Sequence, residues 1–203
     1  MIVIVRHGNT FESGEPPRRI GARTDLPLTG KGVEQADALG EYFANHATTF
    51  NRILTSPLTR AEQTTDRIMA KQEKGVSIQH SEFLREIDYG PDENQLEGDV
   101  LTRIGAEALE AWEQRAVAPD GWIVGAEERL TAWRELLSEP GSRDQNTLLV
   151  TSNGAARFAL LADADLRVQA ESLSSLKLPT GGLGILDWSG PDGWRISAWG
   201  VRP

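Results

Sequence analysis

The chain has 203 residues, which suits a single domain spanning residues 1–203. Apolar residues make up 39% and charged residues 25% of the chain, as in ordinary globular proteins, so the composition argues against a disordered or fibrous protein. The 21 basic and 30 acidic residues give a formal charge of −9, which argues against nucleic acid or an anionic membrane as a partner.

The chain contains no cysteine, which excludes a disulfide framework, a cysteine-based zinc site and a thiol nucleophile. No apolar run approaches the roughly 20 residues that a membrane span requires. The opening apolar run, Met1–Val5, is short and is not preceded by the basic residues of a secretory signal. We therefore expect a cytoplasmic protein with no membrane partner.

Short apolar runs predict the strands of a sheet. Ile2–Val5 and Thr147–Thr151 suit central strands that are buried on both faces, and Arg52–Thr55 is a shorter candidate. Each run is followed by a turn and then a helical pattern, which predicts an α/β fold: a three-layer α/β/α sandwich around a mostly parallel mixed sheet. Near the C-terminus, Gly184–Trp188 and Trp194–Trp199 flank a turn and predict a β-hairpin.

Two of the expected helices begin at recognisable caps. Thr29 is a good N-cap, and the apolar residues that follow it at helical spacing are Val33, Ala36, Gly40 and Phe43. Ser56 is expected to cap a second helix, with Pro57 in the first helical position. The inner stripe of this second helix is expected to hold Leu58, Ala61, Thr65 and Ile68.

The segment from about residue 81 to 125 lacks clear strand patterns, and we interpret it as a small helical insertion that covers one edge of the sheet. Within it, Asp99 is expected to cap one helix whose inner side carries Leu101, Ile104, Ala108 and Trp112. Two further helices are expected at Leu130–Leu137 and Ala155–Ala162. Two loops are expected at Glu12–Arg19 and Glu139–Asn146.

The first strand runs directly into Arg6-His7-Gly8-Asn9-Thr10. In open α/β sheets, ligands bind beyond the carboxyl ends of the strands, so a histidine beside an arginine at this place is a candidate for chemistry. Gly8 would let the backbone approach a ligand closely, and Asn9 and Thr10 would add hydrogen-bond donors. Taken alone, the triplet could also be a chance sequence or a cap.

A second candidate cation, Arg60, lies in the first turn of the helix expected after Arg52–Thr55. The free N–H groups and the dipole of a helix N-terminus attract anions, and Arg60 points away from the apolar stripe of its helix. The alternative is an ordinary solvent-exposed arginine on a helix.

Two more polar positions follow later in the chain. Glu86, in the segment Leu84–Gly90, is a candidate acid that could protonate a departing oxygen, with Asp88 as a rival and a solvated surface acid as the alternative. Asn153 follows the strand Thr147–Thr151 and could donate a neutral hydrogen bond, although Asn-Gly is also a common turn pair.

Together these segments resemble the histidine phosphatase superfamily, the group that includes the cofactor-dependent phosphoglycerate mutases. The resemblance covers nearly the whole chain. Four segments carry it and occur in the family's order: Arg6–Thr10, Gly21–Gly32, Ser56–Thr64 and Leu84–Gly90. Four motifs in the right order are a specific signal.

The resemblance implies that His7 attacks phosphorus and becomes a phosphohistidine, while Glu86 gives a proton to the leaving alkoxide and then helps to activate water. It also implies a phosphorylated small-molecule substrate, with no metal and no cofactor. The expected phosphate-binding and substrate-binding residues are Arg6, Asn9, Thr10, Arg23, Arg60 and Asn153. Arg18, Arg19 and Arg23 could contact the non-reacting part of an anionic substrate or could be solvated charges.

The sequence departs from the family at Asn153, where the family normally has a second histidine followed by glycine. Asparagine keeps a donor but loses the positive charge, which weakens the hydrogen bond by about 1 kcal/mol or more. An equal loss of transition-state stabilisation would slow the reaction roughly tenfold or more. His80 could stand near the pocket rim and replace that histidine; otherwise it is a surface residue. His46 is expected at a helix C-terminus, where a cation suits the dipole.

Three functions follow from these residues. The first is a phosphomonoesterase that works through a phosphohistidine. The second, motivated by Asn153, is a non-catalytic protein that binds a phosphorylated ligand or regulates through it. A phosphoglycerate mutase is the third, disfavoured because the chain is shorter than typical mutases and because of Asn153. Specificity is expected to come from the loop Phe11–Ala22 and from the insertion, while the substrate and the oligomeric state stay open.

Overall fold

The computed structural model describes residues 1–72 and 75–203. The strands in this part form one mixed sheet in the order β3-β2-β4-β1-β5-β6. The strands are β1 Ile2–Arg6, β2 Arg52–Thr55, β3 Ile78–His80, β4 Thr147–Thr151, β5 Leu183–Trp188 and β6 Trp194–Val201. Strands β1 to β4 pair in parallel, whereas β5 runs antiparallel to both β1 and β6.

The two central strands explain why the sequence is apolar without interruption there. Val3 lies opposite Leu148 and Val5 opposite Val150 in the parallel β1–β4 ladder, and all four side chains are buried. Side chains of a strand alternate between the two faces of the sheet. Both faces of β1 are covered by helices, so both sets of its side chains are apolar.

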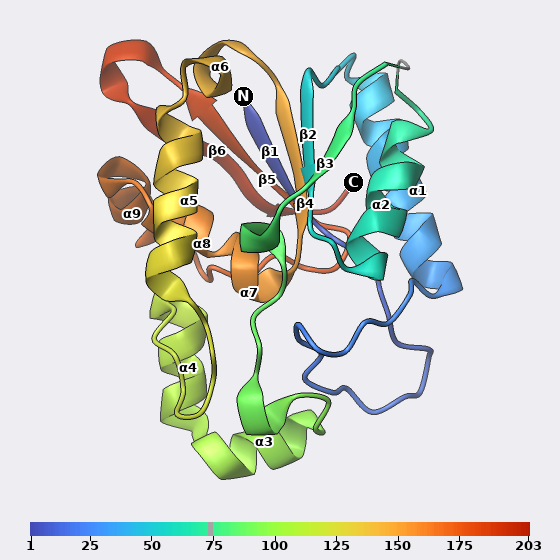
Figure 1. The fold of residues 1–203 in the computed structure, drawn as a ribbon, viewed down its shortest axis with the longest axis vertical. Coiled ribbons are helices and arrows are strands. Elements are labelled where there is room, and N and C mark those ends of the chain that lie inside the picture. The colour runs from blue at the N-terminus through green and yellow to red at the C-terminus, as the bar shows by residue number, and fades with distance from the viewer. Residues whose placement is uncertain (73–74) are drawn as a thin grey trace.

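Helices cover the two faces of the sheet as separate layers (Figure 1). The layer packed on Val3 and Val5 consists of α1 Gly30–Asn45 and α2 Thr59–Met69. Ile2 and Ile4 face the opposite layer. Its helices are α5 Ala126–Ser138, α7 Asn153–Ala156, α8 Phe158–Leu161 and α9 Ala164–Ala170. The predicted three-layer α/β/α sandwich with a mostly parallel sheet is confirmed.

The helix starts were predicted unequally well. Thr29 is the N-cap of α1, and its Oγ1 accepts from the N–H of Gly32 at 3.2 Å, as expected. The start of α2 at Ser56-Pro57 was wrong, because the helix begins at Thr59. The carboxylate of Asp25, which comes from a distant loop, accepts from Thr59 N at 2.8 Å and replaces a local cap. The inner stripe of α2 is buried as predicted.

The segment 81–125 is helical, but its arrangement differs from the expectation. The single helix expected after Asp99 is two helices, α3 Glu97–Ile104 and α4 Ala106–Arg115, because Gly105 between them has φ +80°. Asp99 lies inside the first turn of α3. Both helices lie beyond the carboxyl ends of the parallel strands rather than along an edge of the sheet (Figure 1).

Three other expectations can be compared with the fold. The predicted hairpin is confirmed, since Trp188 pairs with Trp194 across β5 and β6. The expected helix Ala155–Ala162 is divided into α7 and α8 around Arg157. The expected loop Glu139–Asn146 instead contains α6 Pro140–Asp144, because Pro140 takes a first-turn position that suits its fixed backbone.

Across residues 1–72 and 75–203, no helix combines the length and the apolar character that crossing a bilayer requires.

Candidate active site

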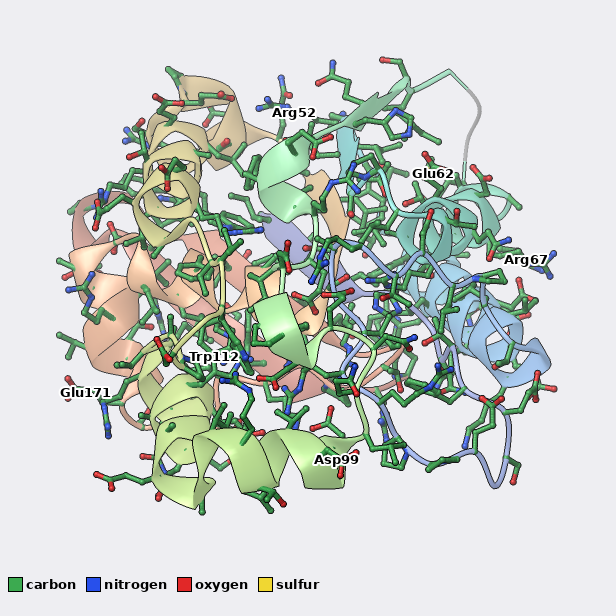
Figure 2. The ribbon with its side chains drawn as sticks, turned by 60° about the horizontal axis from the view of Figure 1, so that its bottom comes forward. Arg52, Glu62, Arg67, Asp99, Trp112 and Glu171 are labelled. Carbon is green, nitrogen blue, oxygen red and sulfur yellow. The ribbon has the colours of Figure 1, made fainter. Side chains whose placement is uncertain are left out.

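A cavity of about 350 Å³ opens at the carboxyl ends of the central parallel strands. Figure 2 turns this end of the molecule toward the viewer and labels Trp112 of α4, which is buried. The predicted site residues that line the cavity are Arg6, His7, Thr10, Arg60, Glu86 and Asn153. A larger cavity of about 420 Å³, bordered by α4, α5, α8 and α9, is lined by none of the predicted site residues.

Hydrogen bonds fix the tautomer of His7. Its Nδ1 lies 2.7 Å from the carbonyl oxygen of Gly8. A carbonyl only accepts, so Nδ1 must carry the proton and donate it. The other ring nitrogen, Nε2, keeps its lone pair and accepts from Nε of Arg60 at 3.1 Å. Nε2 is therefore the ring nitrogen that can act as a nucleophile.

The surroundings of His7 also keep its ring neutral. The side chain is buried, and the guanidinium groups of Arg60 and Arg6 lie close enough to repel a proton. Burial first, and then these two positive charges, hold the pKa of His7 well below its ordinary value of 6.5. His7 is consequently a neutral imidazole at neutral pH, and its unprotonated Nε2 accepts from Arg60.

Backbone carbonyls hold the guanidinium group of Arg60 in place. Its Nη1 donates to the carbonyl of Thr24 at 2.9 Å, and its Nη2 donates to the carbonyl of Gly21 at 3.1 Å. Arg6 is held in the same way, through Nη1 and the carbonyl of Leu178 at 2.8 Å. Burial lowers the pKa of both arginines, yet a guanidinium stays charged in proteins. The site therefore presents two fixed cations beside His7.

Gly8 and Asn9, which follow His7, contact other parts of the protein instead of the cavity. A Cβ at Gly8 would lie 2.2 Å from the carbonyl oxygen of Gly32, so glycine is needed for close packing against the start of α1. The side-chain amide of Asn9 donates to Phe11 O and, at 3.2 Å, to Thr29 Oγ1. Asn9 accordingly does not line the cavity, whereas Thr10 does.

Glu86 and Asp88 lie in different surroundings. The buried carboxylate of Glu86 borders the cavity and accepts from the N–H groups of Ile87 at 3.0 Å and Gly154 at 3.1 Å. Asp88 accepts from Nε of Arg23 at 3.0 Å, and neither partner lines the cavity. The arrangement brings Glu86, but not Asp88 or Arg23, to the other site residues.

Asn153 is the first residue of α7 and borders the cavity. Its Oδ1 accepts from the N–H of Leu178 at 3.0 Å, which leaves its Nδ2 amino group as the donor available to the cavity. A Cβ at Gly154 would lie 2.2 Å from Oε1 of Glu86, so the glycine after Asn153 makes room for that carboxylate.

The other two histidines lie away from the cavity. His80, on the edge strand β3, pairs with Glu62 at 2.8 Å and does not line the cavity. Of the two interpretations of His80, a replacement for the family histidine or a surface residue, the structure agrees with the surface residue. His46 caps the C-terminal end of α1, and its Nδ1 lies 2.8 Å from the carbonyl of Tyr42.

Several lining residues were not among the predicted site residues. Tyr89 lines the cavity and belongs to the same segment as Glu86, but the sequence pattern predicts no role for it. Burial raises the pKa of its hydroxyl. Lys177 and Glu113 form an ion pair at 3.1 Å although they are 64 residues apart in the chain. Only the fold brings such partners together, so no local pattern in the sequence could have revealed them.

Comparison with known proteins places the chain in a family. The family model of the histidine phosphatase superfamily (branch 1) matches residues 2–202. The chain belongs to the histidine phosphatase superfamily. The resemblance seen in the sequence is thereby confirmed, while the replacement of a family histidine by Asn153 stays a prediction.

Individual relatives agree with this assignment. A protein named "probable phosphoglycerate mutase GpmB", from Salmonella paratyphi A, is 32% identical over 211 residues, which cover 99% of this chain and 90% of the relative. The fold matches that of a mycobacterial glucosyl-3-phosphoglycerate phosphatase with a TM-score of 0.75 and 21% identity, over 98% of each chain. An α-ribazole phosphatase from Shigella flexneri gives a TM-score of 0.71 at 21% identity, over 99% of this chain and 96% of that one.

Proposed function

We propose that this protein hydrolyses phosphate monoesters of small molecules through a phosphohistidine formed at Nε2 of His7. The observation that carries the proposal is the fixed, neutral state of His7, a residue that lines the cavity: its Nδ1–H is bound to Gly8 O, and its unprotonated Nε2 accepts from Arg60. A neutral imidazole of this kind is a competent nucleophile at neutral pH. The cavity also holds Arg6, Arg60 and Glu86, which supply positive charge and an acid.

In the first step, Nε2 of His7 attacks phosphorus and the bond between phosphorus and the ester oxygen breaks. The leaving oxygen takes a proton from the carboxyl group of Glu86, so that an alcohol departs. Arg6 and Arg60 offset the negative charge on the phosphoryl oxygens. The Nε–H of Arg60, which donates to His7 Nε2, turns to a phosphoryl oxygen as that nitrogen forms its new bond.

In the second step, water attacks the phosphohistidine. The carboxylate of Glu86 takes a proton from this water as the new bond to phosphorus forms and the bond to His7 Nε2 breaks. Inorganic phosphate leaves, and Glu86 is again protonated for the next cycle. The sequence of steps needs neither a metal nor a cofactor.

Thr10 and the amide of Asn153 complete the proposed phosphate site as neutral donors. A neutral donor stabilises a developing anion less than a charged one does. We therefore expect hydrolysis to be roughly tenfold slower than with a cationic donor at this position. Asn9 and Arg23 are left out of the proposed site, because their side chains are held by Thr29 and Asp88 outside the cavity lining.

Hydrolysis of a generic aryl phosphate tests the proposal. Removing the nucleophile with His7→Ala should lower kcat by at least about a thousandfold. His80→Ala removes a histidine that lies outside the cavity lining and should leave the rate within about twofold of the wild type. Equal rates for the His7→Ala variant and the wild type would contradict the proposal.

A second candidate function is favoured by Asn153: a protein that binds a phosphorylated ligand without turning it over. The two arginines and the neutral amide could hold a phosphate group even if the chemistry is slow. Tight binding of a phosphorylated metabolite with neither turnover nor a phosphoenzyme would support this candidate. The least favoured candidate, a phosphoglycerate mutase, requires conversion of 3- to 2-phosphoglycerate by a bisphosphate-primed enzyme.

A further inference from the structure

The cavity has two parts that differ in exposure. The inner part holds the phosphoryl-binding Arg6 and three side chains that are almost completely buried, His7, Arg60 and Glu86. The charged side chains of the outer part are more exposed than these three and would face the alcohol part of an ester. These outer charges are Arg18, Arg19, Lys177, Glu97 and Glu113.

Arg19 is a fixed part of the outer wall whose charge is already compensated. Its guanidinium forms an ion pair with the carboxylate of Glu97. The same group lies 5.3 Å from the ring centres of both Tyr89 and Trp122. Its side chain is only 12% exposed, so it is not free to swing toward a ligand.

Lys177 and Arg18 are engaged as well. Nζ of Lys177 lies 3.1 Å from Oε1 of Glu113, which neutralises the ammonium group. Nη1 of Arg18 donates to the neutral side chain of Asn94 at 2.7 Å, and its guanidinium lies 5.8 Å from the ring centre of Phe11.

We propose that the outer cavity selects phosphate monoesters whose alcohol part carries no negative charge, such as polyols, over esters that carry a carboxylate. This inference rests on the proposed function. A carboxylate that pairs with Arg19 or Lys177 takes that cation away from Glu97 or Glu113, which is unfavourable. The third cation, Arg18, has the neutral partner Asn94, and an exposed ion pair with it would contribute at most about 1 kcal/mol. Hydroxyl groups meet no such penalty, because they donate to carboxylates and accept from cations.

Glycerol 3-phosphate and 3-phosphoglycerate form a matched pair for the test. They differ at one terminal carbon, which carries a hydroxyl group in the first compound and is a carboxylate in the second. We expect kcat/KM to be at least about fivefold higher for glycerol 3-phosphate, since one unfavourable charge contact costs a factor of this order. A kcat/KM that is equal or higher for 3-phosphoglycerate would overturn the inference.

Two substitutions in one ion pair should move this preference in opposite directions. The preference is the ratio of kcat/KM for glycerol 3-phosphate to kcat/KM for 3-phosphoglycerate. Glu113→Gln frees Lys177 and should lower this ratio about fivefold, whereas Lys177→Gln leaves Glu113 uncompensated and should raise it. Glu110→Gln is the matched control, because Glu110 lies on the same helix, is hydrogen-bonded to Gln114 and does not line the cavity. An unchanged preference in both pair variants would count against the role of the pair.

Binding measurements separate this inference from the proposed function. Dissociation constants for both compounds, measured calorimetrically with the His7→Ala variant, should favour glycerol 3-phosphate. If the wild type hydrolyses neither these compounds nor an aryl phosphate, the proposed function fails, and the two dissociation constants still decide the ligand class. Tighter binding of 3-phosphoglycerate that is lost in Arg18→Gln would overturn the inference and identify Arg18 as a carboxylate site.

Discussion

His7 is buried between two guanidinium groups, and its lowered pKa links the site to the stability of the protein. Above pH 6.5 the ring is neutral in both the folded and the unfolded chain, so it contributes no pH dependence. As the pH falls below 6.5, the unfolded chain binds a proton that the folded chain refuses. The free energy of unfolding therefore decreases as the pH falls toward the folded-state pKa.

This linkage can be measured by urea denaturation at pH 7.5 and pH 5.5. The wild type should lose about 1 kcal/mol more unfolding free energy between these two pH values than His7→Gln, which cannot take up the proton. An equal loss in the two proteins would mean that His7 has an ordinary pKa in the folded state. In that case its imidazole would not be held neutral for attack.

Asn153 is the second residue whose chemistry can be tested by a single substitution. In Asn153→His, the new imidazole can direct Nε2–H toward the cavity, and when it is protonated this donor is a cation that no longer accepts from Leu178 N as Oδ1 does. We expect kcat for an aryl phosphate to rise about tenfold, because a donor that can be cationic replaces a neutral one. A fall in kcat would show that the asparagine has a specific role of its own.

The sequence could predict candidate residues for the site, but not the direction of each side chain. His7, Arg6, Arg60 and Glu86 stand in short motifs, so their types and order sufficed to select them. Asn9 was selected on the same grounds, yet its amide is used by neighbouring loop atoms. A motif specifies which residue types occur, whereas the direction of each side chain depends on partners elsewhere in the chain.

At the scale of the elements, α2 positions Arg60, and its start depends on Asp25. The Asp25 carboxylate accepts from the backbone N–H and the hydroxyl of Thr59, both at 2.8 Å. Asp25→Ala removes this cap and should lower the free energy of unfolding by about 1 kcal/mol and Tm by about 2–4 °C. Thermal denaturation measures the change.

Glu34→Ala on α1 is a suitable comparison for that substitution. Glu34 is an exposed acid, and its loss should change the unfolding free energy by no more than about 0.5 kcal/mol. If Asp25→Ala is as stable as Glu34→Ala, the carboxylate of Asp25 does not stabilise the start of α2.

Elements with a clear local pattern were predicted well, and those set by distant partners were not. Ile2–Val5 is apolar throughout and Thr147–Thr151 is apolar between its two threonines, a pattern typical of a strand covered on both faces. The start of α2 was misplaced because Ser56-Pro57 looks like a cap while Asp25 supplies the actual one. The division into α3 and α4 was missed because Gly105 fits a helix interior poorly but does not by itself prohibit one.

At the scale of the whole molecule, the parallel sheet gathers the site. The carboxyl ends of β1 and β4 bring His7 and Asn153 to one place although the two residues are far apart in the chain. Helices α3 and α4 close the same end of the sheet and contribute Glu97 and Glu113 to the outer cavity. The sequence predicted the sandwich, the candidate residues at this end of the sheet and the two segments that border the outer cavity. It did not predict the ion pairs of the outer wall, because these join segments that no motif connects.

Trapping the phosphoenzyme tests most directly whether His7 is the nucleophile. The wild-type protein is mixed with an aryl phosphate at neutral pH, quenched rapidly in base and analysed by peptide mass spectrometry. We expect one acid-labile phosphoryl group on His7, formed and lost at rates that match turnover, and no such group in His7→Ala. Turnover without any phosphoryl group on His7, or with the group on another residue, would contradict this role of His7.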